Sequence, residues 1–230
     1  MVGIAAATRG ELAAAARAVA RADLSDAFGH VSVRTGWSTA LITPPVPLGT
    51  VADDDGAVPL DIEGSTLPAD APLEAWLHLA IYRARPDIGA VCRAQPRAVA
   101  ALTAVRSDLP RVNGHAAMLG DVVVHRDARL IRDAASAASA ARDLATADAL
   151  VLRGNGAVTT GTDLPAAVAR MWLLERSAEL ALRALAAGAV EELDAKDREW
   201  WRARAGELLP RIYRYLGEST QTSEKNRSTS

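Results

Sequence analysis

Hydrophobic positions follow two different periods along the chain, and this alternation predicts helices interleaved with short strands. Apolar residues recur at helical spacing over residues 8–23, 72–85, 96–105, 131–146, 164–187 and 194–216. Alternating or continuously apolar runs rich in β-branched residues predict strands over residues 29–34, 40–43, 58–62, 88–92, 120–124, 149–152 and 157–160. Helices that interleave with strands in this way favour an α/β or α+β domain built in layers.

Capping residues and prolines set the expected ends of these elements. Thr8 and Glu11 have the spacing of a capping box, and Asp163 precedes a long apolar helix as its N-cap. Pro72 falls in the first turn of its helix, where a missing backbone N–H is tolerated. We expect Pro210 to interrupt the last helical region, because proline removes an intrahelical bond and clashes with the preceding turn.

The composition favours one globular domain. Half of the 230 residues are hydrophobic but only 4% are aromatic, so we expect a core built mainly from Ala, Val, Leu and Ile. A single domain is expected over residues 1–217. The remaining residues, 218–230, are polar and rich in Ser and Thr, which predicts a disordered tail.

Charge and targeting signals indicate a cytoplasmic protein that binds neither nucleic acid nor membranes. The formal net charge of −2 gives no general attraction to polyanions. The N-terminus lacks the basic and then apolar pattern of a signal peptide, and no run of about 18 uncharged apolar residues predicts a membrane span. The single cysteine, Cys92, excludes an internal disulfide and fits a reducing compartment.

Glu74 and His78 lie four residues apart on a predicted helix and therefore share one face. The helix macrodipole would favour Glu74 in the first turn by about 0.3–1 kcal/mol, which is a structural explanation of that residue. His78 is expected to be a buried, hydrogen-bonded histidine. A metal role would need further ligands, because two ligands on one helix face do not complete a site.

Arg93 follows a buried strand, where a charged side chain needs a partner. It could form a structural ion pair with Glu74 or Asp87. It could equally present its planar guanidinium to a carboxylate or phosphate of a ligand. The adjacent Cys92 points to the opposite face of the strand and is expected to pack in the core as a small hydrophobic residue.

Histidines and glycines in expected loops are the other candidates. His115 follows Asn113 and Gly114 in a predicted loop, and a histidine pKa lies near neutrality, which suits proton transfer. A glycine precedes His30 at a strand start, where it permits a ligand to approach the backbone or simply forms a bend. The sequence Arg153-Gly154-Asn155-Gly156 is typical of a tight turn. Phosphate-loop, dinucleotide-binding and paired-cysteine motifs are absent from the sequence.

Several weak motifs, taken together in their order, resemble those of the class II aldolase/adducin family. Residues 29–34 resemble its Gly-[Asn/His]-[Ile/Val]-Ser-x-Arg motif and residues 41–44 its Leu-Ile-Thr-Pro motif. Residues 60–64, 74–87 and 152–156 resemble later segments of the family. The resemblance covers roughly residues 10 to 190.

This resemblance implies a three-layer αβα sandwich around a mostly antiparallel central sheet, often assembled as a homotetramer with sites at subunit boundaries. Family members perform aldol cleavage, epimerisation or decarboxylation, usually with a divalent metal that stabilises an enediolate. The three metal-binding histidines of the family would fall here on Arg93, Gln95 and Asn155, and its acid/base glutamate on Glu74. An arginine and two carboxamides are not zinc ligands of the usual kind.

Two hypotheses follow from this mismatch. The first is a lyase that needs no metal or other cofactor and acts on a small carboxylate- or carbonyl-bearing metabolite. Its catalytic residues would be Glu74, Arg93 and His115, with His30 as the alternative to His115 for the second proton carrier. The substrate-binding residues would be Gly29, His30, Thr43, Gln95 and Asn155. Asp70, in the loop before Glu74, would repel a phosphate and disfavours a sugar phosphate as the substrate.

The second hypothesis is a non-catalytic, adducin-like binding or scaffold protein. Here Glu74 and Arg93 would form a salt bridge that fills the former metal site. Both hypotheses are compatible with a homotetramer in the cytoplasm.

Overall fold

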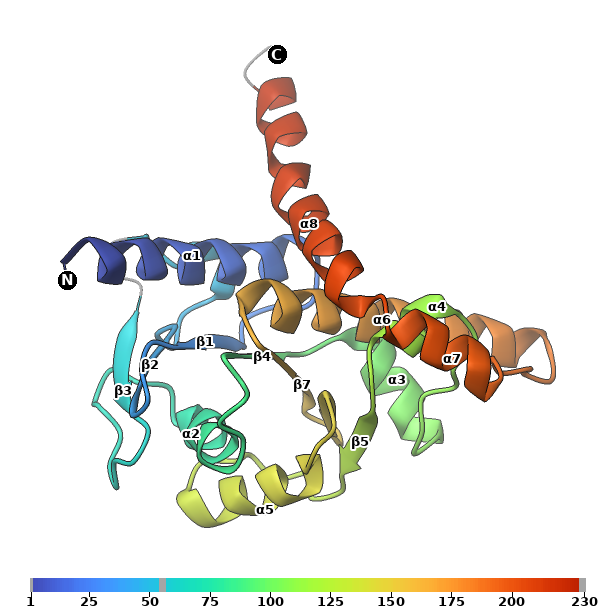
Figure 1. Ribbon diagram of the computed structural model, residues 1–230, viewed down its shortest axis with the longest axis horizontal. Coiled ribbons are helices and arrows are strands. Elements are labelled where there is room, and N and C mark those ends of the chain that lie inside the picture. Colours follow the sequence, from blue (N-terminus) through green and yellow to red (C-terminus); the bar gives the residue numbers. More distant parts are fainter. Residues whose placement is uncertain (1, 54–56, 228–230) are drawn as a thin grey trace.

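The computed structural model describes residues 2–53 and 57–227. A seven-stranded sheet in the order β3-β2-β1-β4-β7-β6-β5 forms the centre of the molecule (Figure 1). The strands are β1 (His30–Arg34), β2 (Thr39–Ile42), β3 (Val58–Asp61), β4 (Ala90–Ala94), β5 (Val122–His125), β6 (Ala149–Leu152) and β7 (Gly156–Gly161). Every neighbouring pair is antiparallel except β5 and β6, which are parallel.

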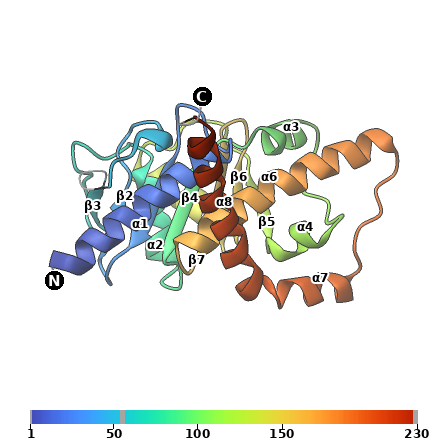
Figure 2. The same ribbon diagram turned by 90° about the horizontal axis from the view of Figure 1, so that it is seen from above.

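Helices cover both faces of this sheet and complete three layers (Figures 1 and 2). The helical elements are α1 (Val2–Arg21), η1 (Leu48–Thr50), α2 (Ala75–Ala84), α3 (Arg97–Val105), α4 (Gly114–Met118), α5 (Ala134–Leu144), α6 (Leu164–Ala187), α7 (Ala195–Arg202) and α8 (Ala205–Arg227). Helices α2 and α5 pack together on one face, and α1, α3 and α6 cover the other. The predicted αβα architecture with a mostly antiparallel sheet is therefore confirmed.

Each face of the sheet has its own hydrophobic core, and β4 contributes to both. Cys92 packs with the α1 and α6 side, whereas Val91 packs with the α2 and α5 side. Both cores consist mostly of Ala, Val, Leu and Ile, as the composition predicted. Alternation of side chains along a strand explains how one segment serves two cores.

Several predicted boundaries agree with the structure, and others are wrong. The helix over 164–187 and its cap are confirmed, because Asp163 Oδ1 accepts a hydrogen bond from Ala166 N at 2.8 Å. The proposed capping box at Thr8 is wrong, since α1 already begins at Val2. Helix α2 begins at Ala75, three residues after Pro72, because a turn closes first through the bond from Ala75 N to Pro72 O.

The C-terminal helices also differ from the prediction. The break lies at residues 203–204, and Pro210 sits inside α8. Pro210 is close to the helix start, where its missing N–H removes a single intrahelical bond. The backbone is helical through Arg227, within the stretch 218–230 where a disordered tail is expected, and residues 228–230 of that stretch lie outside the described residues. In the described part of the chain, every helix falls short of the length and apolarity that a bilayer crossing requires.

Candidate functional site

A buried arginine on the central strand joins three separate segments of the chain. Arg93 of β4 is 1% exposed, and its Nη2 atom donates to Glu74 Oε1 at 3.1 Å. The same nitrogen lies 3.0 Å from both the backbone oxygen and Oδ1 of Asn155. Glu74 is the residue before α2, and Asn155 lies in the turn between β6 and β7. We call these residues, together with His30 and His78, the Arg93 cluster.

Two glycines let the backbone approach Arg93 closely. Gly29 precedes β1 with a φ of +140°, and a Cβ there would lie 3.1 Å from the carbonyl oxygen of Arg93. Gly156 ends the Asn155 turn with a φ of +96°, and a Cβ there would clash with the carbonyl oxygen of Ala94. Both conformations are readily available only to glycine. The glycines thus fix where the Asn155 turn and the start of β1 meet β4.

Two neutral histidines lie beside the arginine. His30 pairs with Arg93 in the β1–β4 register, and its ring meets the ring of His78 edge-on with centroids 6.1 Å apart. Burial, with a smaller contribution from the charge of Arg93, lowers the pKa of His30 to about 3. Burial also lowers the pKa of His78 well below its usual value, with smaller contributions from His30 and Arg93. Both imidazoles are therefore uncharged near neutral pH.

Two side chains, Ser32 and Tyr82, form a series of hydrogen bonds that ends on His78. Its Nδ1 atom lies 2.7 Å from Ser32 Oγ, which in turn lies 2.8 Å from the hydroxyl of Tyr82. Burial raises the pKa of Tyr82, so its hydroxyl stays protonated. The expectation that His78 is buried and hydrogen-bonded is confirmed. Ser32 and Tyr82 were missed, although the spacing of Glu74, His78 and Tyr82 at every fourth residue places all three on one helix face.

Unsatisfied polar atoms concentrate around Arg93. Among the described residues, seven buried side-chain nitrogen or oxygen atoms have no hydrogen-bond partner, and five of them belong to the Arg93 cluster. These five are Arg93 Nε, Arg93 Nη1, Asn155 Nδ2, His30 Nδ1 and His78 Nε2. An unpaired buried polar group costs about 1–3 kcal/mol. Buried polar atoms of this kind normally have a partner, which can be bound water or a polar ligand.

Two members of this cluster, Arg93 and Asn155, are not ligands that a divalent metal usually takes. Arg93 is a cation, and burial lowers its pKa while the carboxylate of Glu74 opposes that shift. Asn155 offers only a carboxamide, and its Oδ1 already accepts from Arg93. Zinc sites use histidine, thiolate and carboxylate ligands. Over residues 2–53 and 57–227, no three such side chains are placed to share one ion.

The remaining predicted site residues have different positions. Gln95 follows β4 and is half-buried; its backbone N–H donates to Leu24 O at 3.0 Å, and its side-chain carboxamide makes no hydrogen bond to another described residue. Thr43 is fully buried and accepts a hydrogen bond from Val31 N at 3.1 Å, which ties β2 to β1. Cys92 is buried, and burial raises its pKa to about 12, in line with the expected inert core residue.

His115 does not lie where the sequence predicted. It belongs to helix α4, not to a loop, because the side chain of Asn113 caps that helix through Ala116 N at 3.0 Å. Its ring packs against Trp172 of α6 with centroids 5.7 Å apart. It lines a cavity with Trp201 and Tyr215 that contains no residue of the Arg93 cluster. Within one chain, His115 and Glu74 are therefore separate.

The sheet order and the two helical layers place the chain among aldolase-like αβα domains. It belongs to the family described as Class II Aldolase and Adducin N-terminal domain, which it matches over residues 10–182.

Two curated relatives carry the name 3,4-dihydroxyphthalate decarboxylase. The relative from Terrabacter sp. (strain DBF63) is 31% identical over 212 residues, which cover 84% of this chain and 87% of the relative. The relative from Arthrobacter keyseri is 32% identical over 210 residues, with 82% and 84% covered. The solved L-fuculose 1-phosphate aldolase from Glaciozyma antarctica PI12 has a TM-score of 0.79 at 23% identity and covers 95% of this chain and 91% of its own, which shows a shared fold.

Proposed function

We propose that this chain is a lyase that acts on a small carboxylate- or carbonyl-bearing molecule without a divalent metal. The five unsatisfied polar atoms of the Arg93 cluster carry this proposal. Arg93 Nε, Arg93 Nη1 and Asn155 Nδ2 are donors without an acceptor among the described residues, and the oxygens of a bound substrate would supply acceptors. Fixed donors aimed at developing negative charge in a site shielded from water are among the most effective means of catalysis.

The decarboxylase names of the two relatives make decarboxylation the first reaction to test. In that reaction the C–C bond to a carboxylate breaks, the electron pair stays on the substrate, and a proton replaces CO₂ at carbon. Arg93 and Asn155 would hold the oxygen that takes up the charge, with Gln95 as a further donor. Glu74, which is half-buried at the rim, would carry the proton.

Neutral His30 fits hydrogen bonding better than proton transfer in this scheme. With a pKa of about 3 it is a weak base, and protonating it beside Arg93 would place two cations together. Gly29 and Thr43 would shape the site and would not contact the substrate. Gly29 lies close to the carbonyl oxygen of Arg93, and Thr43 Oγ1 accepts from Val31 N, so both position β1.

We also propose that the chain forms a homotetramer with the Arg93 cluster near a subunit boundary. Phe28 and Leu73 are 66% and 55% exposed and stand immediately beside Gly29 and Glu74. Large apolar side chains exposed at the rim of a site favour coverage by another protein surface. Only such an assembly could bring His115 of one subunit to the Arg93 cluster of another, so its catalytic role depends on the tetramer.

A non-catalytic, adducin-like scaffold is the second candidate, and one observation favours it. Arg93 Nη2 already has carboxylate and amide partners, so the ion pair could serve structure alone. Assaying CO₂ release from hydroxylated aromatic acids, after dialysis against a chelator, separates the two. Turnover that survives chelation supports the metal-free lyase. Turnover that returns only with added zinc contradicts metal independence. Absence of turnover with all of the aromatic acids tested supports the scaffold.

A further inference from the structure

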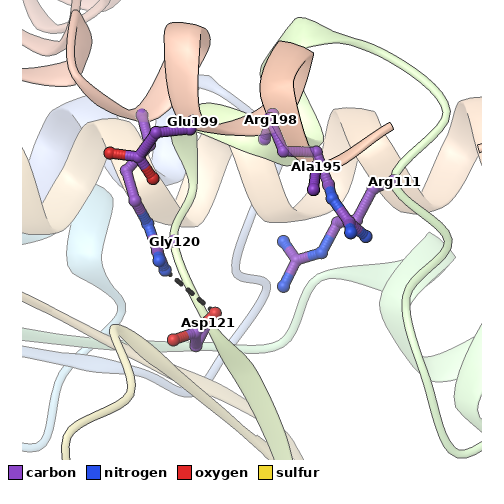
Figure 3. A pocket seen from close by; sticks show the side chains of 8 residues that line it. Arg111, Gly120, Asp121, Ala195, Arg198 and Glu199 are labelled. Carbon is purple, nitrogen blue, oxygen red and sulfur yellow. Dashed lines mark ion pairs between the residues drawn. The ribbon is translucent and has the colours of Figure 1, made fainter. Parts of the chain in front are cut away.

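A polar cavity that contains no residue of the Arg93 cluster lies between the loop before α4, the start of β5 and helix α7. Its volume is about 370 Å³. Figure 3 shows that Arg111 enters it from the loop and Arg198 from α7, with Asp121 at the start of β5. Arg202 and Glu199 of α7 complete the charged lining. The cavity therefore brings three guanidinium groups and two carboxylates together.

Two of the three guanidinium groups form no ion pair with a residue that the structure describes. Arg202 forms an ion pair with Asp121 at 2.9 Å, which is the dashed contact in Figure 3. Arg198 forms no ion pair with any residue that the structure describes. Arg111 donates from Nη1 to the backbone oxygen of Ala116 at 2.6 Å and likewise lacks an ion pair within the described ranges. The lining thus has three guanidinium groups against the carboxylates of Asp121 and Glu199, an excess of one positive charge.

The backbone holds Arg111 rigidly in this position. Its backbone N–H donates to Glu192 Oε2 at 3.0 Å, and its carbonyl oxygen accepts from Leu193 N at 2.9 Å. The connection between α6 and α7 therefore clamps both sides of the residue. Burial lowers the pKa of Arg111, the charges of Asp121 and Glu192 oppose the shift, and Arg202 and Arg198 add to it. A fixed, poorly solvated guanidinium of this kind is suited to bind a planar or tetrahedral oxyanion.

We propose that this cavity binds a small dianion, such as inorganic phosphate or a short dicarboxylate, between Arg111 and Arg198. The guanidinium groups of Arg111 and Arg198 can each donate to oxygens of such an anion, and charge-assisted hydrogen bonds are the stronger kind. The carboxylate of Glu199 also lines the cavity and opposes an anion. Substitutions at these two adjacent residues should therefore have opposite effects on anion affinity. Removing Arg198 must weaken binding, whereas removing the charge of Glu199 must strengthen it.

Isothermal titration of the full chain with inorganic phosphate and, separately, with succinate at low ionic strength tests this proposal. We expect Arg198→Gln to raise the Kd at least about tenfold and Glu199→Gln to lower it about threefold. Arg183→Gln is the matched control, since Arg183 is an exposed residue of α6 outside the cavity. It removes the same charge and should leave the Kd within about twofold. Comparing the two anions decides whether the site takes phosphate or carboxylate.

Three results would overturn the proposal. The first is that neither anion binds, and the second is that Arg198→Gln and Arg183→Gln change the Kd equally, as a general charge effect would. The third is that binding is lost in Arg93→Met but unchanged in Arg198→Gln, which would assign the anion to the Arg93 cluster. That last outcome would leave the proposed lyase function standing, so the two proposals fail separately.

Discussion

Arg93 Nη2 lies 3.1 Å from Glu74 Oε1, yet the two side chains are buried to different depths. The side chain of Arg93 is 1% exposed and that of Glu74 is 13% exposed. The cation therefore depends on the carboxylate more than the carboxylate depends on the cation, because Glu74 can still be solvated. Removing one partner of a buried pair typically costs about 3–5 kcal/mol, mostly from the charge left behind.

Replacing Glu74 should therefore destabilise the protein more than replacing Arg93. We expect Glu74→Gln to lower the free energy of unfolding by about 3 kcal/mol, because Arg93 stays buried and charged. Arg93→Met should cost about 1–2 kcal/mol less than Glu74→Gln, since it also removes two unsatisfied nitrogens. Urea denaturation of both single variants and the double variant gives their coupling, which we expect to be about 1–3 kcal/mol. Strictly additive effects would contradict a coupled pair.

The surface pair Arg85–Asp87 supplies the control for that cycle. Its atoms are 2.7 Å apart, but Asp87 is 63% exposed. Asp87→Asn should therefore change stability by no more than about 1 kcal/mol. Because the Arg93–Glu74 pair is buried in the lyase and in the scaffold alike, stability cannot separate the two functions. A folded Glu74→Gln variant that loses turnover by a factor of about 10² or more would support proton transfer by Glu74.

Restoring histidine at the three positions where the family resemblance places metal ligands should create a zinc site. We expect the triple variant Arg93→His, Gln95→His and Asn155→His to bind about one zinc per chain, because neutral imidazoles would replace a cation and two carboxamides. Elemental analysis of the purified proteins measures this directly. The unaltered chain should contain far less than one equivalent. Stoichiometric zinc in the unaltered chain would contradict the metal-free proposal, whatever the variant shows.

The fold was largely predictable because its signals are local. The apolar runs that form β6 and α6 gave those elements their boundaries, and Asp163 capped α6 as its spacing implied. The errors arose at helix boundaries that depend on contacts between residues far apart in the sequence. Pro210 was expected to end a helix but lies inside α8, where packing against α6 supports the helix. Thr8 has the sequence of a cap, yet the helix simply continues through it.

The site was only partly predictable for the same reason. The pairing of Glu74 with Arg93 was one of two options in the sequence, and geometry decided it because Asp87 pairs with Arg85 instead. Ser32 meets Tyr82 from 50 residues away, which no local pattern reveals. His115 was chosen because it seemed to lie in a loop, but the Asn113 cap forms a short helix and turns it toward Trp172.

Mild acid should destabilise the protein through its buried histidines. The pKa of His30 is about 3 when folded, below its usual value near 6.5, and that of His78 is also lowered. The unfolded state therefore binds more protons between these values, so stability is full above pH 6.5 and falls as the pH drops. Together the two histidines should reduce the free energy of unfolding by about 3 kcal/mol from pH 7.5 to 5.5.

Denaturation at the two pH values, with His30→Gln alongside, checks this expectation. The variant should lose about half of the pH dependence. The carboxyls of Asp87 and Asp133 do not contribute to this change in stability between pH 7.5 and 5.5. Their pKa values are lowered below 3.8, so they take up protons only at more acid pH. His115→Gln serves as the control, since His115 is only half-buried and burial lowers its pKa less completely. An unchanged stability at pH 5.5 would mean that both buried histidines can be protonated in the folded state.

Charges at the rim of the Arg93 cluster should disrupt the proposed tetramer. We expect Phe28→Asp combined with Leu73→Asp to shift the chain to smaller species, because two exposed apolar side chains would become charged at a subunit boundary. Light scattering after size-exclusion chromatography measures the mass. Leu130→Asp is the matched control, because Leu130 is also exposed but lies in the loop between β5 and α5. A monomeric unaltered chain at micromolar concentration would rule out the tetramer.

Two buried serines should respond in opposite ways to the loss of a hydroxyl group. Ser32 Oγ bridges His78 and Tyr82 in the interior, so Ser32→Ala removes a hydrogen-bond partner from two buried polar groups. Each such group costs about 1–3 kcal/mol, and we expect a total loss of about 2–4 kcal/mol.

Ser177 of α6 is equally buried, but its Oγ has no hydrogen-bond partner among the described residues. Ser177→Ala should therefore leave stability unchanged or raise it by up to about 1 kcal/mol, because alanine needs no partner and favours the helix. Urea denaturation of both variants under identical conditions compares them directly. Equal losses for the two serines would show that burial of the hydroxyl alone, and not the bridge from His78 to Tyr82, determines the effect.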